Sequence, residues 1–269
     1  MVISAGKGMP GLPLVEPKRS LGQNFLTDKS IAIMESEFAR GRNAIELGPG
    51  LGILTAELCK VAKSVLAIEI DQRLYTYLSA NLPCDRLKML NADFFGVDKG
   101  AFKGYDILIS NVPYNLSSKV LSWIVDNRME AVLCLQKEFV EHMNANPGTH
   151  RYTNLSVFSS LLLNTEEIAK VPSSSFHPRP KVDSKVIHIK VKDTQIKQGV
   201  LRVISMIMSH KKKRLKNAVM DSRRYLSMER EEILGLVKEL PNAEARPFQL
   251  SPEHILESAT YIANRIKRA

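Results

Sequence analysis

The segment Asn111-Val112-Pro113-Tyr114 carries side chains suited to gripping an amino group on a planar ring. It follows the apolar run 107–109, so we expect a strand to deliver it to a loop at the strand's carboxyl end. The Asn111 side-chain oxygen and a backbone carbonyl can both accept hydrogen bonds from an –NH2 group, and Tyr114 offers a flat face for stacking. Taken alone, a strand-ending turn explains the segment equally well, because Asn and Pro are common in turns.

A glycine-rich turn at 48–52 follows the predicted strand 43–47 and opens a helix. Glycines let the backbone turn tightly and approach a ligand closely. The spacing differs from the G-x-G-x-x-G of dinucleotide-binding folds, and Glu46 precedes the first glycine, so a cationic or zwitterionic ligand suits the turn better than a pyrophosphate. The chain also lacks the G-x-x-x-x-G-K-[ST] phosphate loop. These features argue against a dehydrogenase and against a P-loop nucleotide hydrolase.

Acidic residues mark the ends of the next two predicted strands. Glu69 ends the strand 64–69, where a carboxylate can accept both hydroxyls of a ribose. Asp93 and Phe94 follow the strand 87–91, and a carboxylate beside an aromatic ring suits the amino group and face of an adenine. Either acid could instead be a helix cap. Their order at successive strand ends matches the class I S-adenosylmethionine-dependent methyltransferases.

The elements that must position these groups alternate between strand and helix. After a helix at 29–39, we expect strands at 43–47, 64–69, 87–91, 106–110 and 131–135, with helices at 53–62, 71–80 and 117–126. This pattern predicts an α/β fold with a doubly wound, mainly parallel, Rossmann-like sheet of the class I methyltransferase type. Later strands at 165–170 and 185–191 flank a proline-rich loop, and only helices follow, at 198–216, 228–239 and 251–267. We therefore expect a flexible segment 1–19, a methyltransferase domain 20–194 and a small all-α domain 195–269.

The net charge of +10 over 269 residues favours a polyanionic partner, nucleic acid rather than a membrane. Residues 192–269 hold 16 basic and 9 acidic residues, so most of the excess positive charge lies in the helical region. A solvated helix face is an alternative explanation for a charge run of this kind. The residues that we predict to bind RNA are Lys211, Lys212, Lys213, Arg214, Lys216, Arg223 and Arg224.

Cys59, Cys84 and Cys134 are widely spaced and form neither a C-x-x-C pair nor a zinc-ligand pattern. We expect them to be small core residues in a reducing compartment. The sequence begins with no secretory signal pattern and contains no run of 18 apolar residues. These features predict a cytoplasmic protein.

Several segments together resemble one family, the KsgA-type small-subunit rRNA adenine N6,N6-dimethyltransferases. The segment 111–115 resembles the substrate loop of that family, with Val112 in place of the commoner Leu. The other similar segments are 20–26, 135–139, 176–184, 209–215 and 246–252. The resemblance spans about residues 18–265. It implies dimethylation of two adjacent adenosines near the 3′ end of small-subunit rRNA, with the small ribosomal subunit as partner, in a monomer without a metal.

The strand-end pattern and the resemblance together predict the cofactor site. For S-adenosylmethionine we expect contacts from Gln23, Asn24, Leu26, Glu46, Gly48, Gly50, Glu69, Ile70, Asp93, Phe94 and Asn111. The resemblance places Asn24 and Leu26 near the methionine end, Glu69 at the ribose and Asp93 at the adenine N6. It places Asn111 where the cofactor meets the target base.

Catalysis is predicted to rest on positioning. We expect the Asn111 oxygen and the Val112 carbonyl to accept the two N6 hydrogens, so that the nitrogen lone pair turns toward the methyl group. Tyr114 and Phe176 are expected to stack on the base, and Pro113 to shape the loop; Phe176 could instead anchor its loop on the core. Two rival functions remain open: methylation of a large-subunit adenine, and a non-catalytic role in ribosome assembly.

Overall fold

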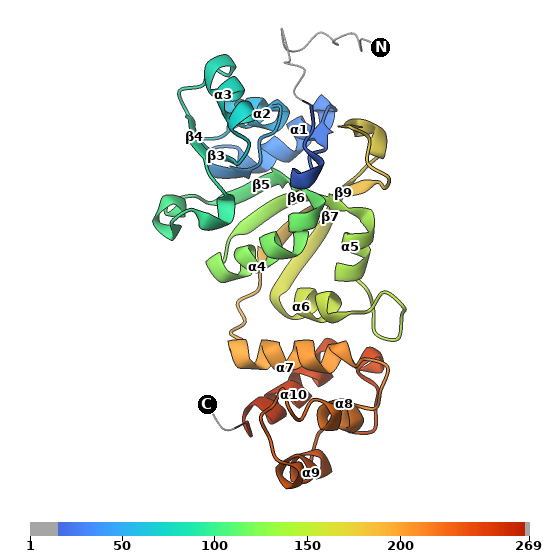
Figure 1. Ribbon diagram of the computed structural model, residues 1–269. Helices are drawn as coiled ribbons and strands as arrows, with labels where there is room; N and C mark the ends of the chain where they lie inside the picture. Colours follow the sequence, from blue (N-terminus) through green and yellow to red (C-terminus); the bar gives the residue numbers. More distant parts are fainter. Residues whose placement is uncertain (1–15, 267–269) are drawn as a thin grey trace. The chain divides into compact units, whose positions relative to one another are not determined.

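The computed structural model describes residues 16–266 (Figure 1), so most of the predicted flexible segment 1–19 lies outside the described residues. The described chain forms two compact units. The first runs up to Lys137 and includes Thr165–Lys190; the second consists of Glu138–Asn164 and the described residues from Val191 onward. The second unit thus contains a segment that the sequence analysis placed in the domain 20–194. The division into functional domains stays a prediction.

Among the described residues, seven strands form one sheet in the order β4-β3-β2-β5-β6-β9-β7 (Figure 1). Strands β2 to β6 pair in parallel, and β9 is antiparallel to β6. The bounds are β2 Asn43–Leu47, β3 Ser64–Glu69, β4 Leu87–Asn91, β5 Ile107–Asn111, β6 Glu130–Gln136, β7 Leu163–Val171 and β9 Ser184–Val191. The predicted doubly wound, mainly parallel sheet is therefore confirmed.

Helices connect the parallel strands. Asp28 caps α1 by accepting a hydrogen bond from the Ser30 N–H (3.0 Å), and Asp71 caps α3 by accepting one from the Arg73 N–H (3.2 Å). Such caps satisfy N–H groups that lack a partner within the helix. The helices of the first unit are α1 Lys29–Ser36, α2 Ile53–Val61, α3 Gln72–Asn81 and α4 Ser117–Asn127.

One face of the sheet packs against α1 and α2. Ile107 and Ile109, which alternate along β5 and so share a face, belong to one buried cluster with Leu54 and Leu58 of α2 and Ala32 of α1. The central strands are covered on both faces, which explains why they read as continuous apolar runs. This packing fixes the carboxyl ends of β2 and β5, from which the site is built.

The second unit is helical. Its helices are α5 Lys137–Met143, which begins at the last residue of the first unit's segment, α6 Asn154–Leu162, α7 Gln198–Ser209, α8 Leu215–Asp221, α9 Arg230–Lys238 and α10 Pro252–Ala263. Tyr152 is fully buried, and its hydroxyl donates to the Leu250 carbonyl (3.0 Å). The all-α character predicted for this region of the sequence is confirmed, and α5 and α6 are additional helices that the sequence pattern did not predict.

The predicted continuous helix 198–216 is wrong in its last part. Helix α7 ends at Ser209, and residues 210–214 form a turn before α8. The Leu215 N–H donates to the Ala245 carbonyl (2.8 Å), so a bond to a distant segment replaces one that would continue the helix. The contiguous cations 211–214 also repel one another within a helix.

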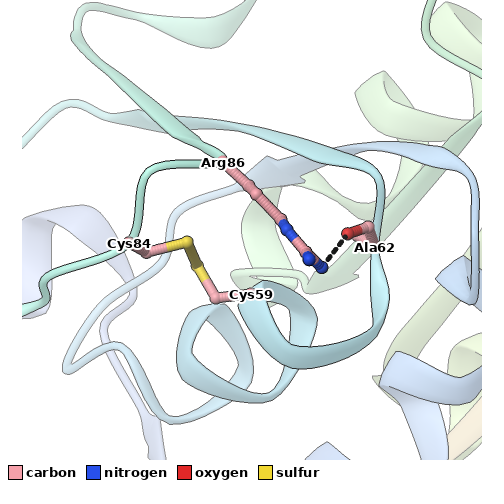
Figure 2. The surroundings of a disulfide bond; sticks show 4 residues. All are labelled: Cys59, Ala62, Cys84 and Arg86. Atoms are coloured by element: carbon pink, nitrogen blue, oxygen red, sulfur yellow. Dashed lines mark hydrogen bonds between the residues drawn. A yellow bond between two sulfur atoms is a disulfide. The ribbon is translucent and has the colours of Figure 1, made fainter.

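Cys59 on α2 and Cys84 in the loop before β4 form a disulfide, with their Cα atoms 6.3 Å apart (Figure 2). The expectation of reduced core cysteines is therefore wrong for this pair, whereas Cys134 is a buried free thiol. A separation of 25 residues without a motif carries no pairing signal in the sequence. Arg86 joins the same region by donating to the Ala62 carbonyl (3.2 Å) (Figure 2).

Within residues 16–266, no helix has the length and apolar character needed to cross a bilayer.

Candidate active site

A cavity lies at the carboxyl ends of the parallel strands of the first unit. The chain runs from β2 outward to β3 and β4 and then returns to β5 on the other side of β2, so the loops after β2 and β5 diverge. Ligands of open α/β sheets bind at such a switch point. The cavity wall includes Gln23, Asn24, Phe25, Gly48, Gly50, Glu69, Ile70, Asp93, Phe94, Asn111, Val112, Pro113, Tyr114, Lys119, Cys134 and Phe176.

The glycine-rich turn closes the end of β2. The Gly48 N–H donates to the Ile68 carbonyl (2.9 Å), and the Gly50 N–H donates to Glu69 Oε2 (3.2 Å). Gly52 has φ +83°, and a Cβ there would lie 2.4 Å from Leu78 Cδ2. The left-handed backbone and the close approach of α3 both require glycine at this position.

Glu69 is buried, with 3% of its surface exposed. Its Oε1 accepts a hydrogen bond from the Asp71 N–H (2.8 Å) and its Oε2 the one from Gly50. Burial raises the pKa of this carboxyl, although the backbone donors act in the opposite direction. Each oxygen keeps a second lone pair, so the carboxyl can still accept bonds from a diol.

Asp71 connects the segment before the short strand β1 (Phe25–Leu26) to the rim of the cavity. Arg73 (2.6 Å), Gln23 (3.2 Å) and Lys18 (3.3 Å) all donate to its carboxylate. Led by Arg73, these donors hold the pKa of Asp71 well below its ordinary value. Gln23 is thereby held at the cavity wall next to Asn24.

Asp93 and Phe94 form the wall beyond β4. Asp93 Oδ1 accepts the Phe95 N–H (3.1 Å), and the Asp93 side chain is exposed. Phe94 is buried against Trp123, with ring centroids 4.8 Å apart. Lys119 Nζ lies 3.9 Å from the centre of the Phe95 ring and adds a cation at the same wall.

At the end of β5, the two ends of the Asn111 side-chain amide differ in their hydrogen bonding. Asn111 Nδ2 donates to Glu35 Oε2 (3.1 Å), whereas Asn111 Oδ1 is buried without a hydrogen-bond partner among the described residues. The Val112 side chain is buried, and the Val112 backbone N–H donates to the Cys134 carbonyl (3.3 Å). The Tyr114 hydroxyl forms a hydrogen bond with Ser184 Oγ (2.9 Å), which fixes its ring in the wall.

Phe176 lies in a short strand, β8 Phe176–His177, rather than in an irregular loop. This strand pairs with β1 Phe25–Leu26 in antiparallel register, with Leu26 opposite Phe176. Phe176 is 6% exposed and belongs to the buried cluster of the first unit, yet it also lines the cavity. Both the stacking role and the anchoring role considered for it are compatible with this position.

The structure brings most of the predicted site together. The five predicted catalytic residues all line the cavity, as do nine of the predicted cofactor contacts. Leu26 and Glu46 do not: Leu26 packs in the core, and Glu46 is 2% exposed with Oε2 unpartnered among the described residues. Burial raises the pKa of Glu46 to about 8, opposed by Thr55 and reinforced by the nearby Glu35 and Glu69.

Sequence reasoning missed Glu35 and Lys119. Glu35 lies in the stretch Met34-Glu35-Ser36-Glu37, which reads as a solvent-facing helix turn; only the packing of α1 shows that it is buried. Lys119 lies in the first turn of α4, the helix that follows the Asn111 segment, and this proximity in sequence is a signal that could have identified it. The part of the chain that the structure describes contains no cluster of His, Cys, Asp and Glu able to hold a metal ion.

The predicted RNA-binding residues lie in the second unit; six of the seven divide into two groups, and Lys211, whose ammonium is bound by a backbone carbonyl, belongs to neither. In the paired basic set, Lys213 bonds Asp221 (2.5 Å), and Arg214 and Lys216 both bond Glu244 (3.0 and 2.5 Å). Lys211 donates to the Tyr152 carbonyl. The unpaired basic set, which makes no ion pair within the described residues, is Lys212, Arg223 and Arg224.

This chain is similar in sequence to a family of known proteins. A family profile described as "Ribosomal RNA adenine dimethylase" matches residues 15–246. The "Probable ribosomal RNA small subunit methyltransferase A" of Thermococcus gammatolerans is 33% identical over 253 residues, covering 92% of this chain and 90% of its own. The protein of the same name from Methanothermobacter thermautotrophicus is 35% identical over 256 residues, covering 92% of each chain.

Two solved structures share the fold. A dimethyladenosine transferase from Plasmodium falciparum has a TM-score of 0.70 at 24% identity, covering 87% of this chain and 95% of its own. The 23S rRNA methyltransferase ErmE has a TM-score of 0.58 at 22% identity, covering 90% of this chain and 99% of its own. These likenesses confirm the predicted fold class. The profile match and the identities above 30% over most of both chains show that this chain belongs to the ribosomal RNA adenine dimethylase family.

Proposed function

We propose that this chain dimethylates N6 of two adjacent adenosines near the 3′ end of small-subunit rRNA, using S-adenosylmethionine, as part of small-subunit biogenesis. The observation that carries the proposal is the Asn111 amide. Its nitrogen is bound by Glu35 and its oxygen lacks a partner within residues 16–266, in a loop that lines the cavity. A buried acceptor that lacks a partner among these residues can bind an exocyclic amino group, which supplies hydrogen-bond donors. The relatives named as small-subunit rRNA methyltransferases support the choice of substrate.

The cavity wall fits S-adenosylmethionine. Gly48 has φ +66° and open space where a Cβ would stand, so the turn offers a bare backbone cradle for the methionine portion. Glu69 retains lone pairs for the ribose hydroxyls, and Asp93 with Phe94 suits the adenine. Gln23, Asn24 and Ile70 complete the wall, whereas Leu26 and Glu46 would support it from behind. When bound, the cofactor would supply an electrophilic methyl group on a sulfonium.

The chain's own residues would make the amino group nucleophilic. The N6 lone pair of adenine is delocalised into the ring, so the amine is a poor nucleophile until its geometry changes. Asn111 Oδ1 and the Val112 carbonyl would accept the two N6 hydrogens and hold the nitrogen with its lone pair directed at the methyl group. Positioning and charge placement of this kind supply the rate enhancement without a strong base.

The target base would be held by stacking after leaving the RNA stack. Tyr114 is fixed by Ser184, and Phe176 by the β1–β8 pairing, so both rings are pre-positioned. Removing a base from its stack costs a few kcal/mol, which stacking on aromatic side chains offsets. The first methylation leaves one N6 hydrogen, so the second methylation needs only one of the two acceptors.

The RNA backbone would be bound by cations of the second unit. The unpaired basic set has no carboxylate partner within residues 16–266 to displace, so it should contribute most to phosphate binding. The paired basic set would exchange an intramolecular partner for a phosphate and gain less. We place this activity in the cytoplasm, with the chain acting as a monomer on the small ribosomal subunit.

Methyl transfer to ribosomal subunits tests the proposal. The protein is incubated with S-adenosylmethionine carrying a labelled methyl group and with undermethylated small or large subunits, and the modified nucleotides are mapped by mass spectrometry. We expect dimethyladenosine at two adjacent positions of small-subunit rRNA. Label confined to large-subunit RNA would select the first rival function, and absence of label from both would select a non-catalytic assembly role.

The Asn111→Ala variant tests the loop itself. Turnover should fall by roughly 10²–10³-fold, the cost of losing one pre-organised polar contact in an active site. Affinity for S-adenosylhomocysteine should change little, because most of the proposed cofactor contacts remain. Asn81→Ala, which removes an exposed asparagine from α3, serves as the control. Unchanged turnover in Asn111→Ala would exclude the proposed role of this side chain.

A further inference from the structure

Glu35 is a carboxyl group in an unusual place. It lies on α1, has 0% of its surface exposed, and Asn111 Nδ2 is the donor that reaches its Oε2. Its other oxygen, Oε1, has no hydrogen-bond partner in the described part of the chain. Glu37, two residues along, is exposed and paired with Arg40 (2.7 Å), as acids on helices usually are.

Glu35 has no counterion among the residues that the structure describes. Glu35 helps to raise the pKa of the buried Glu46 on β2 and of the buried Cys134 thiol on β6, and its polar neighbour is Asn111 on β5. A buried carboxyl without a cation destabilises a fold, and an apolar side chain of similar size would be more favourable there. Stability therefore does not explain the presence of Glu35.

The hydrogen bond does suggest an explanation, because the two ends of an amide are not equivalent. An ionised carboxyl can only accept hydrogen bonds, so it must bind the nitrogen end of the Asn111 amide. The oxygen end is then left for an amino group. With an apolar residue at position 35, the Asn111 amide could rotate by half a turn about its Cβ–Cγ bond and present its –NH2 to the –NH2 of the base. Two donors would then face each other, and no hydrogen bond could form between them.

We propose that Glu35 is a positioning residue that fixes the Asn111 amide with its oxygen available to the target amino group. The proposal rests on the function proposed above for Asn111, and it adds a residue on a different element that acts through it.

The protonation state of Glu35 should then matter. Burial raises the pKa of Glu35 to about 8, and the hydrogen bond from Asn111 acts in the opposite direction. The protonated carboxyl can donate to Asn111 Oδ1, which would favour the opposite amide orientation. Turnover should therefore rise with pH as Glu35 ionises.

Kinetics of two variants at this position, with a matched control, test the proposal. In Glu35→Met, which is apolar and similar in length, turnover on small subunits should fall roughly tenfold or more, with the affinity for S-adenosylhomocysteine within twofold of wild type. Glu35→Gln can both accept from and donate to Asn111, as the protonated carboxyl can, so its turnover should lie between that of Glu35→Met and the high-pH turnover of wild type, without the rise with pH. The control, Glu37→Gln, removes an exposed acid from the short 3-10 helix that directly follows α1 and should match wild type.

Thermal unfolding separates positioning from a structural role. Removing the buried carboxyl in Glu35→Met should raise the melting temperature while turnover falls. If Glu35 were needed merely for structure, Glu35→Met would lower both the melting temperature and the turnover. Wild-type turnover in Glu35→Met, or a parallel loss of stability and turnover in both variants, would overturn the proposal.

An NMR titration provides a readout that needs no methyl transfer. The side-chain amide resonances of Asn111 should shift with the ionisation of Glu35, and in Asn111→Leu the pKa of Glu35 should rise, because its hydrogen-bond donor is lost. If wild type methylates neither subunit, the proposed function fails, and the titration still decides whether Glu35 controls the amide. Asn111 resonances that do not respond to Glu35 would refute the inference even in an active enzyme.

Discussion

Serine replacement of Cys59 and Cys84 together should destabilise the first unit by several kcal/mol. The disulfide closes a loop between residues 25 apart in sequence, which contains β3 and α3. In the chain-entropy description, cutting a cross-link of this loop length returns about 3.5 kcal/mol of conformational freedom to the unfolded chain. For a unit of this size, such a loss corresponds to a melting temperature lower by roughly 10 °C.

Thiol titration and thermal unfolding measure this effect. The denatured, non-reduced protein should contain one reactive thiol, from Cys134, and three after reduction. The Cys59→Ser/Cys84→Ser variant without reductant should melt at the temperature of the reduced wild type, and reductant should not lower it further. This match between reduced wild type and variant controls for the loss of side-chain packing.

Two results would refute this reasoning. Three reactive thiols in the non-reduced protein would show that the two cysteines do not pair. A disulfide that is present but whose reduction leaves the melting temperature unchanged would show that this loop is already restricted in the unfolded chain, so that the entropic estimate does not apply.

Three further predictions concern pH, charge and backbone. Burial raises the pKa of Glu46 to about 8 from an ordinary 4.5, so the stability that the protonated carboxyl contributes is fully present below pH 4.5 and is lost as the pH rises toward 8. Glu46→Gln cannot ionise, so it should be more stable than wild type by about 3 kcal/mol at neutral pH and equally stable near pH 4.5. Denaturant unfolding at the two pH values measures this difference. Charge removal in the unpaired basic set should make the plot of log affinity for small subunits against log salt shallower by about 2 to 3, and removal of the paired basic set should have a smaller effect; equal effects would contradict the division. Gly52→Ala should cost roughly 1–3 kcal/mol in unfolding free energy, because its backbone is left-handed and its Cβ would meet Leu78, and a neutral result would show that the turn can relax.

The sheet and the residues at its strand ends could be predicted from the sequence because the signals are local. Each central strand is an apolar run bounded by turn residues, and the polar groups that matter come directly after those runs. Once β2, β3, β4 and β5 are known to be parallel, their carboxyl ends must meet at one edge of the sheet. The positions of Glu69, Asp93 and Asn111 in one cavity follow from that.

The remaining features depend on contacts between distant segments. Nothing adjacent to Glu35 in sequence distinguishes it from the exposed Glu37, because burial is decided by how α1 meets β5. The Cys59–Cys84 pairing depends on where the loop before β4 passes α2. The end of α7 at Ser209 depends on hydrogen bonds to residues about 30 positions further along the chain. Local propensity and periodicity carry no information on such contacts.

The order of the strands in the described part of the sheet has a consequence for its pairing with foreign strands. Strands β4 and β7 are the outermost strands of the sheet, so each has backbone groups that a foreign strand could pair with. Both carry exposed charges: Lys88 on β4, and Glu166, Glu167 and Lys170 on β7. An added strand would have to bury these charges, which is costly. The charged side chains on the two edge strands therefore disfavour the edge-to-edge pairing that leads to aggregation.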